Sequence, residues 1–112
     1  MTAEKPAVFR TEKAKDTVTI HIGGEFTFER TGAFKTMIKK LIGECGCAPK
    51  IKLDLADCAF VDSGCMGAMA QAQKELSSRG GGLLIVNAQP PVLEAMRRIR
   101  LNAIIPVRGK IQ

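Results

Sequence analysis

Residues 51–67 read IKLDLADCAFVDSGCMG, and this stretch decides the fold. Its first part, IKLDLA (51–56), alternates apolar and polar side chains, which predicts a half-buried strand. A helical pattern then runs over residues 65–78, and Gly80 to Gly82 stop it. The inward side chains are Ile51, Leu53 and Leu55 of the strand and Cys65, Met69, Ala72 and Leu76 of the helix. The loop between the two elements follows the carboxyl end of a strand, where open sheets carry their functional loops.

On the N-terminal side, TVTIHI (17–22) alternates as a second half-buried strand, and AVFRT (7–11) is a candidate partner for it. Gly23-Gly24 either ends that strand or bends it. The segment FERTGAFKTMIKKLIGECG (28–46) has apolar residues at helical spacing with lysines between them. Its inward residues are Phe34, Met37, Ile38, Leu41 and Ile42.

On the C-terminal side, LLIVNA (83–88) is a continuous apolar run, which predicts a fully buried strand. Pro90 and Pro91 favour the first turn of a helix with Val92, Leu93, Met96 and Ile99 inward. AIIPV (103–107) predicts a last strand at a sheet edge, because Pro106 cannot donate a backbone hydrogen bond. The order β-β-α-β-α-β-α-β indicates an α/β fold with a mixed sheet.

The composition indicates one globular domain: 46% of the 112 residues are hydrophobic and 25% are charged. No apolar run reaches the ~20 residues of a membrane-spanning helix. The first 16 residues have no apolar core of a signal peptide, so we expect a cytoplasmic protein with reduced cysteines. The net charge is +6, but Trp and Tyr are absent, which favours solvated basic helix faces over direct nucleic-acid binding.

No pattern of catalytic residues is evident, and we expect no enzyme and no cofactor. His21 is the only histidine, and nothing marks a nucleophile or an orienting acid beside it, so a surface or packing role is expected. Cys45 and Cys47 precede the strand 51–56, whereas Cys58 and Cys65 follow it. A strand of this length separates the two pairs by roughly 15–20 Å, which argues against a shared metal site.

Four stretches in the same order resemble the STAS domain, the fold of bacterial anti-sigma factor antagonists. GGEFT (23–27) is similar to the family's G-E-L-D, and FVDSGCMG (60–67) to its D-S-[ST]-G-[LV]-G. RGGGLLIVNAQPPVLEAMRR (79–98) and RIRLNAIIPV (98–107) resemble its closing strands and helix. The resemblance implies a STAS domain over residues 7–108, with helices mainly on one face of the sheet, a flexible N-terminus over 1–6 and a tail over 109–112.

The resemblance also implies partner switching, in which the antagonist binds a kinase-like anti-sigma factor and is released when a Ser or Thr at a helix start is phosphorylated. The implied partner-binding surface comprises Asp62, Ser63, Gly64, Cys65 and Met66, with Gly24, Glu25, Phe26 and Thr27 beside it. We expect Phe26 and Met66 to be its apolar anchors. On this basis Met66→Asp should abolish binding and leave the fold intact.

This sequence departs from the family pattern at two positions associated with the switch. Gly64 occupies the phosphoacceptor position, and Thr27 occupies that of the family's Asp. Three interpretations remain open. The domain binds its partner as a constantly unphosphorylated form, or Ser63 accepts the phosphate, or the domain is a docking module of a transporter or another signalling complex.

Helix capping and thiol reactivity are two further candidate roles for residues at the start of this helix. Asp62 or Ser63 can cap it, which would compete with phosphorylation of Ser63. Cys65 could be a reactive thiol in a first helical turn. We favour instead a small hydrophobic residue, because the chain has three other cysteines. The identity of the partner and the oligomeric state stay open.

Overall fold

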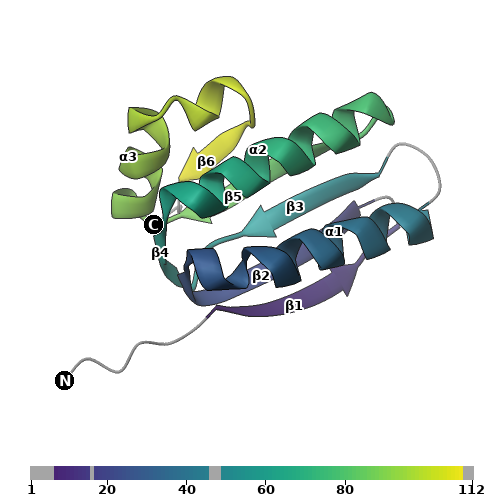
Figure 1. The fold of residues 1–112 in the computed structure, drawn as a ribbon, viewed down its shortest axis with the longest axis horizontal. Coiled ribbons are helices and arrows are strands. Elements are labelled where there is room, and N and C mark those ends of the chain that lie inside the picture. Colours follow the sequence, from purple (N-terminus) through teal and green to yellow (C-terminus); the bar gives the residue numbers. More distant parts are fainter. Residues whose placement is uncertain (1–6, 16, 46–48, 110–112) are drawn as a thin grey trace.

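The computed structural model describes residues 7–15, 17–45 and 49–109, with the side chain of Cys45 left out (Figure 1). The strands are β1 (Val8–Lys13), β2 (Thr17–Phe26), β3 (Lys50–Asp54), β4 (Cys58–Val61), β5 (Gly82–Ala88) and β6 (Val107–Gly109). The helices are α1 (Thr31–Cys45), α2 (Ser63–Ser78) and α3 (Pro90–Arg98), with 3-10 turns η1 (Phe28–Arg30) and η2 (Leu101–Ala103). The fold is therefore α/β, as predicted. The predicted terminal segments lie outside the described residues except for Gly109, which belongs to β6.

The sheet is mixed, with strand order β1-β2-β3-β5-β6 and β4 paired to β2. β1 is antiparallel to β2, which confirms the predicted partner strand, and the other pairs are parallel. Helices α1 and α2 lie next to each other across one face, whereas α3 lies at the end of the sheet beside β4 and β6 (Figure 1). Most of the helical cover is thus on one face, as expected.

The bend in β2 positions the candidate site. Residues 17–21 of β2 pair with β3, and residues 24–26 pair with β4, with a register shift between Gly24 and Glu25. Gly24 has φ 89°, a backbone conformation that glycine adopts without a side-chain penalty. Its N–H donates to the carbonyl of Asp57, at the entrance to β4. The glycine pair therefore bends the strand rather than ending it, and the bend carries the chain to the start of α2.

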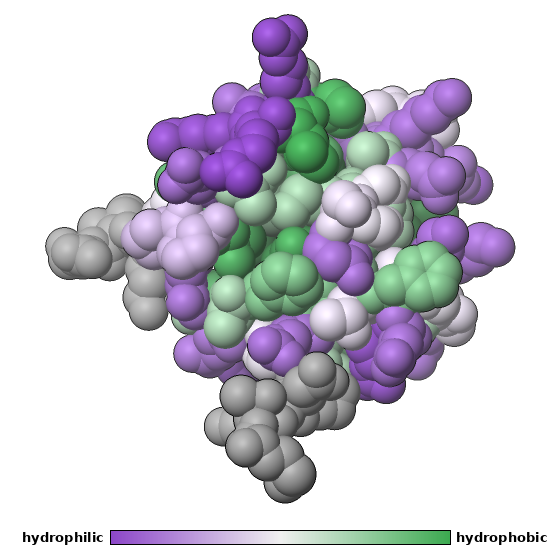
Figure 2. Space-filling view, turned by 60° about the vertical axis from the view of Figure 1, so that its left-hand side comes forward, coloured by the Kyte–Doolittle hydropathy of each residue, from purple (hydrophilic) through white to green (hydrophobic). Residues whose placement is uncertain are grey.

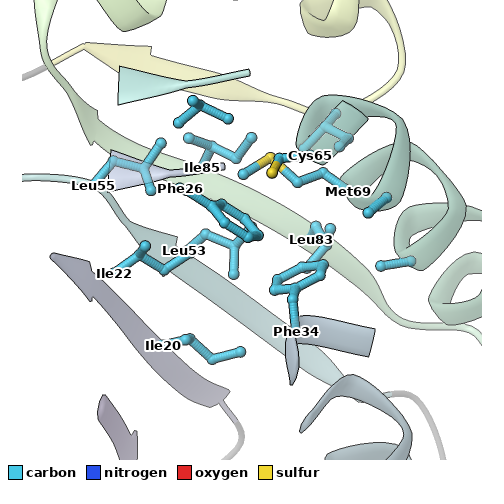
Figure 3. Close-up of a cluster of buried hydrophobic side chains, with 14 of the residues drawn as sticks. Ile20, Ile22, Phe26, Phe34, Leu53, Leu55, Cys65, Met69, Leu83 and Ile85 are labelled. Atoms are coloured by element: carbon cyan, nitrogen blue, oxygen red, sulfur yellow. The ribbon is translucent and has the colours of Figure 1, made fainter. Parts of the chain in front are cut away.

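The core lies between the sheet and the helices α1 and α2 (Figure 3). Alternation along β2 and β3 buries Val18, Ile20, Ile22, Ile51 and Leu53, and α2 contributes Cys65, Met69, Ala72 and Leu76. These inward faces are as predicted. Phe26 and Phe34 point toward each other in this core, with ring centroids 5.4 Å apart, and Phe9 closes the cluster at 5.5 Å from Phe26.

Several predicted details are wrong. The segment 103–107 is not a strand, because the N–H groups of Ile104 and Ile105 donate to the carbonyl of Leu101 in a turn, and β6 begins only at Val107. Ile99 does not face inward: α3 ends at Arg98, and Ile99 is 49% exposed. β5 is not fully buried, since the helices cover one face and its side chains alternate in exposure. A strand not predicted at all, β4, replaces part of the expected loop after β3.

Candidate functional site

Asp62 organises the loop that enters α2. It is the N-cap residue, and its Oδ1 accepts a hydrogen bond from the backbone N–H of Cys65 at 2.9 Å. Its Oδ2 accepts a second bond, at 2.7 Å, from the backbone N–H of Phe28 in η1. The backbone N–H of Asp62 donates in turn to the carbonyl of Phe26 at 3.1 Å. One carboxylate thus joins the end of β2 to the first turn of α2.

These hydrogen bonds also set the charge of the site. Partial burial of Asp62 opposes ionisation, but the N–H groups of Cys65 and Phe28 outweigh it and hold the pKa of the carboxyl group below its ordinary value. The group is therefore an anion at neutral pH, placed where the N-terminal end of a helix favours negative charge. Asp62 and Ser63 were both candidates for the helix cap, and the structure shows that Asp62 is the cap.

The predicted partner-binding residues divide into exposed and buried groups. Ser63 and Gly64 are exposed, while Gly24, Glu25, Thr27 and Asp62 are half-buried. Phe26, Cys65 and Met66 are buried, with exposed fractions of 0%, 0% and 3%. The expectation that Phe26 and Met66 act as surface anchors is therefore wrong, because both side chains fill the core beneath the site. Met66→Asp would place a charge in that core and would disrupt the fold rather than test binding.

Two exposed aromatic residues, which the sequence analysis did not single out, lie at this site. Phe28 is 71% exposed and directly follows the predicted GGEFT stretch, and Phe60 of β4 is 46% exposed and pairs with Glu25 of β2. On the side of the molecule that carries the N-terminal ends of α1 and α2, hydrophobic residues gather in the middle, among hydrophilic ones (Figure 2). The sequence signal available for Phe28 was its position, because it is a large apolar residue at the start of a predicted helical segment. Exposure itself could not be read from the sequence.

The thiol of Cys65 is not arranged for reaction. Burial raises its pKa to about 12, and the neighbouring Asp62 carboxylate acts in the same direction. Cys58 is also buried, and burial raises its pKa as well. A thiol that stays protonated and inside the core is a packing group, which agrees with the hydrophobic role favoured from the sequence. Among the described residues, no group of three His, Cys, Asp or Glu side chains could hold a metal; Cys47 and the side chain of Cys45 lie outside them.

His21 lies on the sheet face that α1 and α2 leave open. Its Nδ1 is 3.0 Å from Asp54 Oδ2 and its Nε2 is 2.9 Å from Glu12 Oε1, so carboxylates occupy both ring nitrogens. Asp54 also accepts from the N–H of Ala56 and the amide of Asn87. Partial burial opposes ionisation of Asp54, but these hydrogen bonds outweigh it and lower the pKa of the Asp54 carboxyl group. The cluster ties β1, β3 and the end of β5 together across the open face.

Comparison with known proteins identifies the fold. A sequence profile described as STAS domain matches residues 9–112. The chain belongs to the STAS domain family. No protein of curated function matches the sequence significantly. Within the described residues, the structure has no helix with the length and apolar character needed to cross a membrane.

Solved structures of other proteins share this fold. TM1081 from Thermotoga maritima, a protein proposed to be an anti-sigma factor antagonist, superimposes with a TM-score of 0.80 at 23% identity, covering 92% of this chain and 82% of that one. The anti-sigma factor antagonist SpoIIAA of Bacillus, in its unphosphorylated form, gives 0.78 at 20% identity, with coverages of 91% and 88%. The murine anion transporter Slc26a9 gives 0.62 at 18% identity, covering 78% of this chain and 14% of the transporter.

Proposed function

We propose that this STAS domain is a regulator that acts by protein–protein interaction, as an antagonist of a kinase-like anti-sigma factor. The observation that carries the proposal is the exposed surface at the start of α2, where the Asp62 carboxylate accepts one hydrogen bond from η1 and one from the first turn of α2. A fixed surface lowers the conformational entropy lost on binding. Similarity to SpoIIAA and TM1081 supports the same class of partner. We propose no reaction and no cofactor for the domain. We also propose that it is located in the cytoplasm.

The proposed surface consists of exposed and half-buried groups. Phe28 and Phe60 are its apolar contacts, and Ser63, Gly64 and the half-buried Thr27 are the polar and backbone groups beside them. Aromatic side chains bury a large area at low entropic cost, which is why they are enriched in interfaces. These two phenylalanines replace Phe26 and Met66 as the anchors of the surface.

We infer that binding here is constitutive. SpoIIAA is known in a phosphorylated as well as an unphosphorylated form. A phosphate adds a charge of about −1.5 to −2, which a surface fitted to a neutral group does not accept easily. Gly64 has no hydroxyl, so this chain cannot receive a phosphate at the position where its family carries the acceptor.

Ser63 is the remaining candidate acceptor at this helix start. Because Asp62 caps the helix, capping does not occupy the Ser63 hydroxyl, which is exposed. A phosphate there would stand beside the ionised Asp62, and like charges repel. Intact mass after incubation with ATP and the recovered kinase decides between constitutive binding and phosphorylation at Ser63. Constitutive binding predicts no gain of about 80 Da, the mass of one phosphoryl group. A gain that Ser63→Ala removes would establish the switch at Ser63.

The proposal is tested by capture from native lysate with the tagged protein, with and without ATP. We expect a kinase-like ATP-binding protein, retained equally in both conditions. Phe28→Asp should abolish capture, because it puts a charge in the centre of the surface. Ile104→Asp is the matched control, since Ile104 is 54% exposed and follows η2 after α3. Loss of capture by both variants, or by neither, would contradict the proposed surface.

A second candidate function is a docking module in a transporter, which the similarity to a domain of Slc26a9 favours. That similarity is lower, and it extends over less of this chain than the similarity to SpoIIAA. Recovery of a transporter component in the same capture experiment, in place of a kinase-like protein, would establish this alternative.

A further inference from the structure

Another side chain lies beside Gly64, next to the position that a Cβ would occupy. A Cβ placed on Gly64 would lie 3.3 Å from Phe28 Cδ2 and 3.5 Å from Asp62 Oδ1. The first distance is shorter than carbon–carbon contacts usually are. An edge of the Phe28 ring therefore lies beside the second residue of α2, and a side chain at position 64 would push that edge back by a few tenths of an ångström.

The backbone that carries the ring is held in place. The N–H of Phe28 donates to Asp62 Oδ2 at 2.7 Å, and its carbonyl accepts from Thr31 Oγ1 at 2.8 Å. The N–H of Arg30 closes the same turn on the carbonyl of Thr27 at 2.9 Å. The position of the Phe28 backbone is thus fixed by three hydrogen bonds, so the ring can leave Gly64 only by rotating about its own side-chain bonds.

Glycine is an unfavourable residue within a helix, because it loses more conformational freedom on folding than alanine does. The backbone of Gly64 is not in the left-handed region, which would have required glycine, since the glycines with positive φ are Gly24 and Gly80. A side chain at position 64 would meet the ring of Phe28, whereas a Cβ on Gly67 in the same helix would meet nothing within 4 Å. Gly64 and Phe28 therefore form a pair, with an aromatic ring beside a residue that has no side chain.

We propose that Phe28 is the specificity-determining residue of this surface and that its ring takes the place of the family's phosphoacceptor side chain. Seated on Gly64, the ring supplies an apolar contact where a relative with Ser or Thr supplies a hydroxyl. It also shields position 64 in part and from one side, since Gly64 itself remains exposed. The matching partner is a protein with an apolar pocket for one aromatic ring. The identity of that partner rests on the proposed function, whereas the cover over position 64 does not.

The cover is tested by thiol labelling. In Gly64→Cys, the rate of reaction of the new thiol with N-ethylmaleimide is measured by peptide mass spectrometry, which separates it from the native cysteines. The same rate is measured in Gly64→Cys/Phe28→Ala. We expect labelling to be several-fold faster without the ring. Gly64→Cys/Phe60→Ala is the matched control, because it removes the other exposed aromatic residue of the same face, and it should leave the rate unchanged.

Equal rates with and without the Phe28 ring would overturn the proposal. Acceleration by Phe60→Ala of the same size as that by Phe28→Ala would also overturn it, because the cover would then not belong to Phe28. Phe28 is 71% exposed, so its removal should leave the fold intact, and an unchanged melting temperature verifies this.

Specificity is tested with the kinase-like protein recovered by the wild-type chain. Phe28→Leu should retain part of the affinity and Phe28→Ala little of it, and Gly64→Ser should accept a phosphate faster when combined with Phe28→Ala. Full affinity of Phe28→Ala, or equal phosphorylation with and without the ring, contradicts the assignment. If no kinase-like protein is recovered, the proposed function fails, and the labelling rates still decide whether Phe28 covers position 64.

Discussion

Replacement of Asp62 by alanine is the most informative perturbation of the site, because one side chain makes both of its organising contacts. The N-cap bond to Cys65 is 2.9 Å long and the bond to Phe28 is 2.7 Å long. Loss of an N-cap costs about 1 kcal/mol. Loss of a second hydrogen bond to a charged acceptor costs about 1.5 kcal/mol, the lower end of the range because the bond is exposed to water. The sum is about 2.5 kcal/mol.

The assay is urea and thermal unfolding of the wild type, Asp62→Ala and Asp62→Asn. At about 4 °C per kcal/mol for a domain of this size, Asp62→Ala should lower the melting temperature by about 10 °C. Asp62→Asn should lose less stability than Asp62→Ala. Its carbonyl oxygen can accept a hydrogen bond from one of the two N–H groups, while its amide NH₂ faces the other. A cost of about 1 kcal/mol is expected for Asp62→Asn.

The pH dependence separates charge from shape. The pKa of Asp62 is lowered in the folded state, so its ionisation stabilises the fold at all pH values above the unfolded pKa of about 4. That stabilisation is lost as pH falls through the folded-state pKa. A protonated carboxyl group, with one acceptor and one donor, resembles the amide of asparagine. The difference between wild type and Asp62→Asn should therefore be present at pH 7 and vanish at strongly acidic pH.

Two results would refute this reasoning. If Asp62→Ala unfolds at the temperature of the wild type, the two hydrogen bonds do not join η1 to α2 in solution. If the difference between the wild type and Asp62→Asn persists unchanged at strongly acidic pH, its origin is not the ionised carboxylate.

Other regions of the chain give further expectations. Gly81→Ala should destabilise the fold by about 3 kcal/mol in urea unfolding, because its Cβ would lie 1.9 Å from the carbonyl oxygen of Pro49. Gly43→Ala, the matched control in an open part of α1, should instead stabilise it by about 0.5–1 kcal/mol; a loss of stability there would contradict the helix assignment. Cys58 and Cys65 should resist a thiol reagent at pH 8 until urea is added, and rapid labelling of Cys65 in the native protein would contradict its burial.

The sequence was sufficient for the elements whose periodicity reflects burial. IKLDLA alternates because β3 has one face in the core and one on the open side of the sheet, and burial follows that alternation at Ile51 and Leu53. Pro90 opens α3 as expected, because the first turn of a helix needs no proline N–H. Such patterns are local, so they can be interpreted without knowing which strands are neighbours.

β4 could not be predicted in this way, because it is defined by its partner. Its four residues, CAFV, have no alternation: Cys58 and Val61 are buried and the two residues between them are exposed. It is a strand because the bend at Gly24 leaves an edge of β2 free beyond β3. The burial of Phe26 and the exposure of Phe28 follow from the same bend, which is why the anchors predicted from the sequence were the wrong residues.

The chemistry of the α2 N-terminus supports the proposal of a permanent contact in place of a switch. Free N–H groups at a helix start can bind a phosphate, but here the ionised Asp62 already accepts from the N–H of Cys65 and from that of Phe28. A phosphate on Ser63, directly beside Asp62, would be repelled by that carboxylate. An edge of the Phe28 ring adds an apolar group beside Gly64 on the same turn. Charge and shape at this surface therefore act in the same direction, toward a partner that recognises an aromatic ring and no added charge.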